Sequence, residues 1–235
     1  MAPYAETNTF GAVDPFTGIA GAFFDFVAAP KSGSTEENVE KGYQGEYLPS
    51  THKKFGEMDE ITAEYVANIV GAITMPTITL GVTDGDLMVT AAKLSSINTG
   101  QLKLSITGHQ HIGALEGTAH VENGHVVVWP SGINGFGAFD PFGSSGIPAA
   151  QIQSSSYDVS IEHIDEKDSV GNFLVGRSQG VKVEASLEAV TDVETVPDPT
   201  GWKMKRPSLK RGNDAFYGIS LAGTMYPGDT WEAGT

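Results

Sequence analysis

The stretch that decides the fold is QLKLSIT, residues 101–107. Its apolar and polar side chains alternate strictly: Leu102, Leu104 and Ile106 share one face, and Lys103, Ser105 and Thr107 share the other. A period of two predicts a β-strand with one buried face and one wet face. Strands of this kind pair in antiparallel sheets, because parallel sheets are covered on both faces.

The same alternation returns along the C-terminal half of the chain, in Tyr157–Ile161 and in Val181–Leu187, and a last strand pair is expected to close at Phe216–Tyr226. Asn123-Gly124, between two short apolar runs, is a strong signal for a tight hairpin. We therefore expect a mainly β protein, an antiparallel β-sandwich or half-barrel with at most one helix.

The one expected helix is Glu60–Ile73, where Ile61, Tyr65 and Ile69 follow a helical spacing and Asp59 could cap the first turn. Its many β-branched residues leave a strand pair open as the alternative. Residues 1–60 show no sustained period, so they are expected to form a long N-terminal arm or extended loops, ordered in part only against a partner. The β domain is expected to span residues 61–235.

Composition excludes several classes of protein. The 235-residue chain carries a net charge of −15, which argues against a nucleic-acid binder, because such a protein needs basic surface to neutralise phosphates. The absence of cysteine excludes disulfides and thiolate zinc sites. The N-terminal residues lack the pattern of a secretory signal, and the most apolar early stretch, residues 18–30, is too short to span a bilayer. We expect a protein made in a cytoplasm, not secreted and not bound to a membrane.

The charge is unevenly distributed. Residues 1–200 hold 9 basic and 26 acidic side chains, a net of −17, whereas residues 201–213 hold five basic and no acidic ones. These five form what we call the basic strip: Lys203, Lys205, Arg206, Lys210 and Arg211. A positive strip on a negative body suits a head-to-tail contact between copies, and a solvated basic strand or loop is the alternative.

A short motif occurs twice. Phe10-Gly11-Ala12-Val13-Asp14-Pro15-Phe16 recurs as Phe136-Gly137-Ala138-Phe139-Asp140-Pro141-Phe142. Asp-Pro favours a turn, so each copy should display two phenylalanines on a turn. Either Phe10, Phe16, Phe136 and Phe142 dock into neighbouring subunits, or they pack into the core of their own chain.

The best candidate for a chemical site is His109-x-His111, with Glu116 five residues further on. Two histidines two apart on a strand share one face and suit a transition metal. The spacing resembles the first metal motif of the cupins, which implies a β-barrel metal-binding enzyme using His109, His111 and Glu116 as an alternative function. The second cupin motif fails at Gly135, where its histidine should stand, and Lys103 replaces an expected glycine. We therefore expect no metal, no cofactor, no catalytic residue and no enzyme activity.

Residues 154–227 resemble the tail-tube and related virion structural proteins of long-tailed bacteriophages. The resemblance lies in the strand Tyr157–Ile164, in GNFLVGRSQGVKVEASLEAVTD after a polar hairpin tip, and in GWKMKRPSLKRGNDAFYGISLAGTMY after a Pro-rich spacer. It implies a protomer that forms homo-oligomeric rings, which stack into a tube with an acidic lumen. The expected partners are other copies and other virion proteins, and the expected location is the virion. The long arm leaves a capsid, decoration or head–tail role open.

Overall fold

A computed structural model describes residues 14–29, 31–38, 53–84, 87–112, 124–167, 173–192, 194, 196–211 and 216–227. The described residues form thirteen strands and one short 3-10 helix, η2, at Ala149–Gln151. The strands are β1 Phe24–Ala28, β2 Lys31–Asn38, β3 Lys53–Ala67, β4 Thr79–Leu80, β5 Thr83–Asp84, β6 Leu87–Ile97, β7 Lys103–Ile112, β8 His125–Val126, β9 Ile152–Lys167, β10 Phe173–Thr191, β11 Lys203–Met204, β12 Ser208–Arg211 and β13 Tyr217–Met225.

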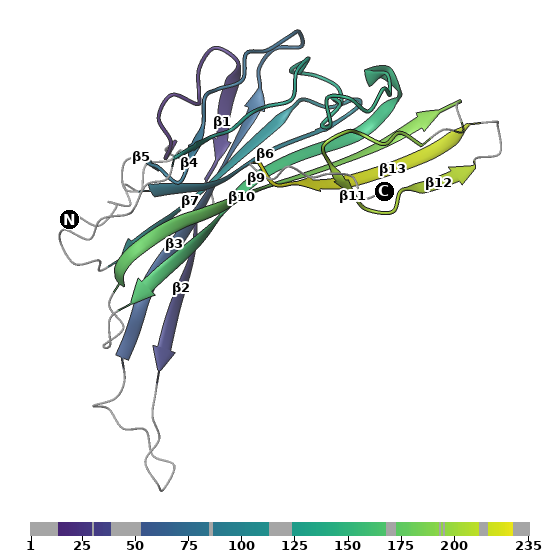
Figure 1. Ribbon diagram of the computed structural model, residues 1–235. Coiled ribbons are helices and arrows are strands. Elements are labelled where there is room, and N and C mark those ends of the chain that lie inside the picture. The colour runs from purple at the N-terminus through teal and green to yellow at the C-terminus, as the bar shows by residue number, and fades with distance from the viewer. Residues whose placement is uncertain are drawn as a thin grey trace, which may run out of the picture.

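Eleven of these strands make one curved sheet (Figure 1). Its main path runs β1-β3-β7-β6-β9-β10-β13-β11; β2 pairs with β3, β12 with β13, and β5 with β6. The pairings along this path are antiparallel. The structure confirms the mainly β, antiparallel class, and its curvature fits the half-barrel form.

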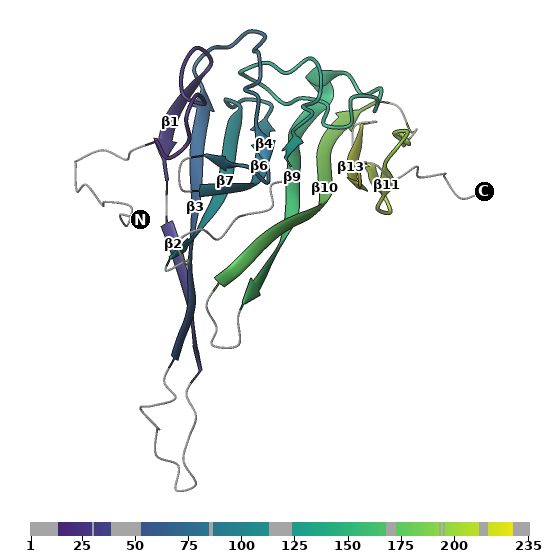
Figure 2. The ribbon, with the colours of Figure 1, turned by 60° about the vertical axis from the view of Figure 1, so that its left-hand side comes forward.

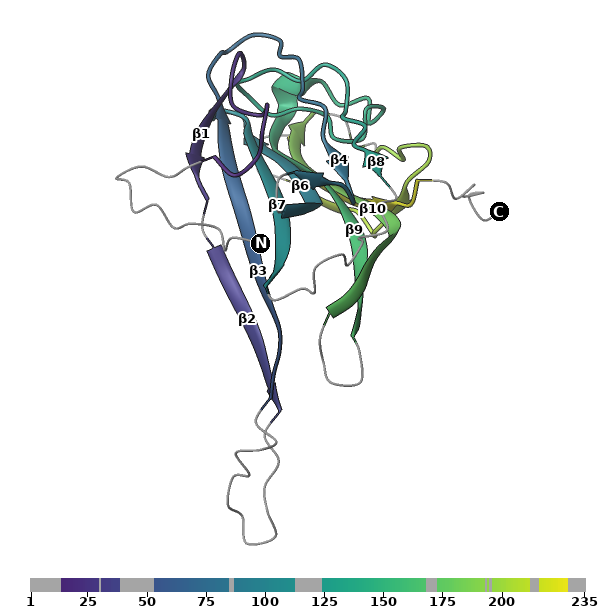
Figure 3. The same ribbon diagram turned by 90° about the vertical axis from the view of Figure 1, so that its left-hand side faces the viewer.

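The sheet spreads from β1 at one edge to β11 at the other (Figure 2). Two long strand pairs, β2–β3 and β9–β10, extend beyond the body of the sheet in the same direction (Figure 3). At the opposite end lie the segments that connect the strands. The molecule therefore differs between the two ends of its strands as well as between the two edges of its sheet.

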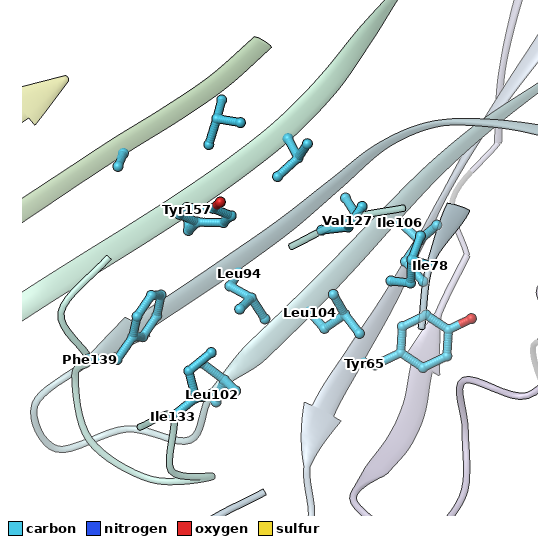
Figure 4. Packing of buried hydrophobic residues seen from close by; sticks show 14 of the residues in the cluster. Tyr65, Ile78, Leu94, Leu102, Leu104, Ile106, Val127, Ile133, Phe139 and Tyr157 are labelled. Carbon is cyan, nitrogen blue, oxygen red and sulfur yellow. The ribbon is translucent and has the colours of Figure 1, made fainter. Parts of the chain in front are cut away.

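One face of the sheet carries the core. Tyr65, Leu94, Leu104 and Tyr157 point from four neighbouring strands into a single buried cluster, as Figure 4 shows. The connecting segments close this face from above, with Ile78, Val127, Ile133 and Phe139 packed into the same cluster. Because alternate residues of each strand point away, the described side chains of the other face, which we call the open face, are mostly polar.

Aromatic rings link the cover to the sheet at its C-terminal half. Trp202 lies edge-on to Phe142 with ring centroids 5.0 Å apart, and its ring is 6.3 Å from that of Tyr157. The polar tips are satisfied: the Tyr157 hydroxyl donates to the Val128 carbonyl at 2.8 Å, and the Trp129 indole donates to the Pro76 carbonyl at 3.0 Å. Burial raises the pKa of Tyr157 to about 12.

The expected helix at Glu60–Ile73 is wrong. Its first half belongs to β3, which ends at Ala67 and pairs with β1 and β7. Ile61, Ala63, Tyr65 and Ala67 are all buried, so the true period is two. The long-range pairing of β3 on both sides decides the structure, and the strand alternative was the right one.

Part of the expected N-terminal arm also belongs to the sheet. β1 and β2 both pair with β3, and the expected boundary at residue 60 falls inside β3. Residues 1–13 and 39–52 lie outside the described residues. Near the expected Asn123-Gly124 hairpin, β8 pairs with β4, and residues 118–121 lie outside the described residues.

The repeated motif forms two equivalent turns, which we call the Asp-Pro-Phe clasps. In the first, the Phe16 amide donates to Oδ1 of Asp14 at 3.0 Å; in the second, the Phe142 amide donates to Oδ1 of Asp140 at 3.0 Å. An aspartate that accepts a hydrogen bond from the backbone two residues on is a recognised turn former. The shared sequence therefore has a shared local structure.

Each clasp presses its phenylalanine ring onto a strand glycine. A Cβ on Gly108 of β7 would lie 3.1 Å from two ring atoms of Phe16, and a Cβ on Gly223 of β13 would lie 3.2 Å from the Phe142 ring. Phe16 and Phe142 are only 3% and 6% exposed. The clasps thus fasten the connecting segments onto the core face at two separate strands.

The first clasp has two further attachments. The Tyr65 hydroxyl donates to Oδ1 of Asp14, and the Thr17 amide and hydroxyl donate to the Asp84 carboxylate at 2.8 and 2.9 Å. Burial, followed by the hydrogen bond to Asp14, raises the pKa of Tyr65. These bonds tie the segment in front of β1 to β3 and β5.

We expect Phe142→Ala to lower the free energy of unfolding by about 3–5 kcal/mol, because it leaves a cavity over Gly223. Phe136→Ala is the matched control, since Phe136 is 42% exposed and its removal should cost far less. Urea unfolding of the two variants measures the difference. Equal losses of stability in the two variants would contradict the role of Phe142 in the clasp.

Candidate functional site: the open face and edges of the sheet

The open face carries a row of hydroxyls across its middle. Ser95 of β6 pairs with Ser156 of β9, which pairs with Ser186 of β10, and the hydroxyls of Ser156 and Ser186 are 2.8 Å apart. Lys103 of β7 continues the row opposite Ser95. These residues line a shallow groove of about 480 Å³ that also includes Val66, Ile97 and Gln101. The groove offers hydrogen bonds and no aromatic surface.

The next row of side chains on the same face, two residues further along each strand, is charged. Lys93 of β6, Asp158 of β9 and Glu184 of β10 lie directly opposite one another. The Lys182 ammonium lies 3.1 Å from the Glu184 carboxylate on the same strand. Burial raises the pKa of Asp158; Lys93 and Lys182 oppose the rise and Glu184 adds to it. The middle of the open face therefore balances charges of both signs.

The basic strip lies at one edge of the sheet. β11 and β12 both pair with the same side of β13, so Lys203, Lys205, Arg206, Lys210 and Arg211 follow the last strand in the path. All five side chains are exposed. Pro207 separates β11 from β12 and cannot donate a backbone hydrogen bond. The basic strip therefore lies on exposed edge strands, which fits the solvated strand of the alternative, and the head-to-tail contact stays a prediction.

The other edge is acidic, which the sequence did not reveal. Asp25 of β1 is exposed there, and Glu64 of β3 is exposed on the adjoining strand, opposite Ala28 of β1. Asp25 accepts a hydrogen bond from the Asn68 amide at 3.1 Å. The two carboxylates come from segments far apart in sequence, and only the pairing of β1 with β3 brings them together. No local pattern could have found them.

The expected aromatic anchors separate into two groups. Phe16 and Phe142 are buried in the core of their own chain, so the core alternative holds for both and they are not exposed docking residues. Phe136 is 42% exposed in the segment that covers the core. Phe10 lies outside the described residues.

The candidate metal ligands are only partly described. His109 is buried, at 7% exposed, in β7 between Glu60 of β3 and Met88 of β6. The side chains of His111 and Glu116 lie outside the described residues. Among the described residues no three histidine or carboxylate side chains are grouped to hold a metal ion. The cupin-like alternative stays a prediction.

No protein-family model matches the chain, and no curated protein is significantly similar to it. Within the described ranges, no helix is both long enough and apolar enough to cross a membrane.

We expect Asp158→Asn to raise stability at neutral pH. Because burial raises the pKa of this carboxyl in the folded state, its contribution favours folding below the unfolded pKa, about 3.9, and is lost as pH rises through the folded pKa. The gain from asparagine should therefore shrink as pH falls through the raised folded pKa and be lost by about pH 4. Urea unfolding over that pH range tests this, with Asp198→Asn as an exposed control. A less stable variant at neutral pH would show that Lys93 and Lys182 outweigh burial.

Proposed function

We propose that the chain is a self-assembling virion structural protein, a phage tail-tube-like protomer that forms rings or tubes. The observation that carries the proposal is a sheet that does not close. Among the described residues, the outer sides of β1 and of β11–β12 have no strand partner. Strand edges left open in this way are templates for pairing with another chain.

The charge of the two edges supports assembly over aggregation. One edge carries the five cations of the basic strip, and the other carries the carboxylates of Asp25 and, on the adjoining strand, Glu64. Surfaces of opposite sign on one molecule attract head to tail, and such contacts form rings when the rotation between copies closes.

The open face supports a tube over a compact particle. It is lined with serine hydroxyls and with charges of both signs, while the chain as a whole is strongly acidic. A surface of this kind holds hydrogen-bonded water and exerts little net electrostatic attraction on a nucleic acid that passes over it. The resemblance of residues 154–227 to tail-tube proteins points to the same role.

We expect purified protein to form rings or tubes of one repeating diameter as its concentration rises. Each contact should bury well over about 1,000 Å², as stable interfaces do. Size-exclusion chromatography with light scattering gives the mass, and negative-stain microscopy gives the shape. A monodisperse monomer at every concentration would remove the proposal.

A further inference from the structure

We infer that copies join through one specific junction: β1 of one copy pairs antiparallel with the β11–β12 edge of the next, acidic edge against basic edge. This inference rests on the self-assembly proposed above and names its contact. Its partner is a second copy of the same chain.

Strand direction allows this junction. The main path contains eight strands, each antiparallel to its neighbour, so β1 and β11 run in opposite directions. A rotation axis roughly along the strands keeps every copy in the same orientation. The β1 strand of the next copy then arrives antiparallel to β11–β12, and the antiparallel order of the sheet continues across the contact. An odd number of strands would force a parallel pair at each junction.

The positions of the residues along the two edge strands also allow this junction. Asp25 is opposite Val66 in β3. The same row crosses the sheet through Lys103, Ser95, Ser156 and Ser186 to Ala222 of β13. The Lys205 amide donates to the Ala222 carbonyl at 2.8 Å. Asp25 and Lys205 therefore lie at the same level on the two edges. Lys210 is opposite Gly218, four residues along β13 from Ala222, so a stagger of four residues in that direction brings Asp25 level with Lys210.

Charge excludes the two alternative pairings of these edges. A twofold contact of β11–β12 with itself brings ten cations together, five from each copy. A twofold contact of β1 with itself brings Asp25, and Glu64 on the adjoining strand, near the same carboxylates of the other copy. Like charges that face each other across a contact cost binding free energy, whereas the unlike pairing gains it. The same charges that block self-pairing of each edge favour the head-to-tail contact.

Cross-linking tests the geometry directly, because the chain has no cysteine of its own. Val27 in β1 is 53% exposed, and Ser208 in β12 is exposed, so Val27→Cys and Ser208→Cys keep the charges and the core. The two variants are purified separately, mixed, allowed to assemble and treated with a short bismaleimide, which tolerates a stagger of the strands. In the matched control, Ile97→Cys is mixed with Ser208→Cys in place of Val27→Cys. Ile97 is 57% exposed and lies in the middle of the sheet.

The expected product is a covalent dimer of Val27→Cys with Ser208→Cys only. Dimers formed by either variant alone show twofold contacts and overturn the inference, as does equal cross-linking by Ile97→Cys. Rings seen by microscopy without the mixed dimer overturn the junction and leave the assembly proposal standing. If no oligomer of any kind forms, both the junction and the assembly proposal are overturned.

Charge reversal supplies the second readout. Lys205→Glu with Lys210→Glu should slow assembly at least about tenfold at low salt, since steering by opposite charges speeds association by about 10- to 1,000-fold. Adding Asp25→Lys and Glu64→Lys to the same chain should restore the rate, because both edges of each copy are then reversed. Lys103→Glu, an exposed lysine of β7, is the control and should change the rate little.

Light scattering after a jump in concentration gives each rate, and urea unfolding confirms that each variant is folded. A fourfold variant that assembles as slowly as the double variant overturns the inference. The result separates the junction from the proposed function, because rings that form at an unchanged rate in every variant keep the assembly and exclude this contact.

Discussion

The burial of one face of the sheet is the constraint on which the rest of the structure depends. Strict alternation in strands such as β7 places every apolar side chain on the same side, and a single sheet cannot bury that side against itself. The connecting segments must therefore cover it. The two Asp-Pro-Phe clasps hold them in place, and each needs a strand residue without a side chain, Gly108 or Gly223, beneath the ring. The repeat in the sequence is thus a repeated solution to one packing problem.

Sequence periodicity predicted the class because alternation is a local property. QLKLSIT in β7 and VKVEASL in β10 hold enough of the pattern for each strand to be assigned alone. Glu60–Ile73 misled us because Ile61, Tyr65 and Ile69 satisfy a helical spacing, while the buried Ala63 and Ala67 that reveal the period of two are weakly apolar. Pairing with β1 and β7 decided the matter, and no local window contains those partners.

The same limit explains what was predicted of the surface. The basic strip was visible because its five cations lie within nine residues. Its acidic counterpart was not, because Asp25 and Glu64 meet only through the register of β1 against β3. The Asp-Pro turns were predicted correctly, but the direction of Phe16 and Phe142 was left open. That direction depends on glycines of distant strands.

An open sheet edge needs both protection and selectivity. Lysine and proline at an edge strand oppose indiscriminate pairing, and the β11–β12 edge has Lys205 and Lys210 with Pro207 between them. A charged edge strand differs from an edge covered by a loop, because its charge opposes pairing only with neutral or like-charged strands. An acidic strand meets attraction at the same edge. A chain that carries both edges on opposite sides of a sheet whose main path has an even number of strands can thus avoid irregular aggregation and still add copies in one direction, which is the property a ring-forming protomer requires.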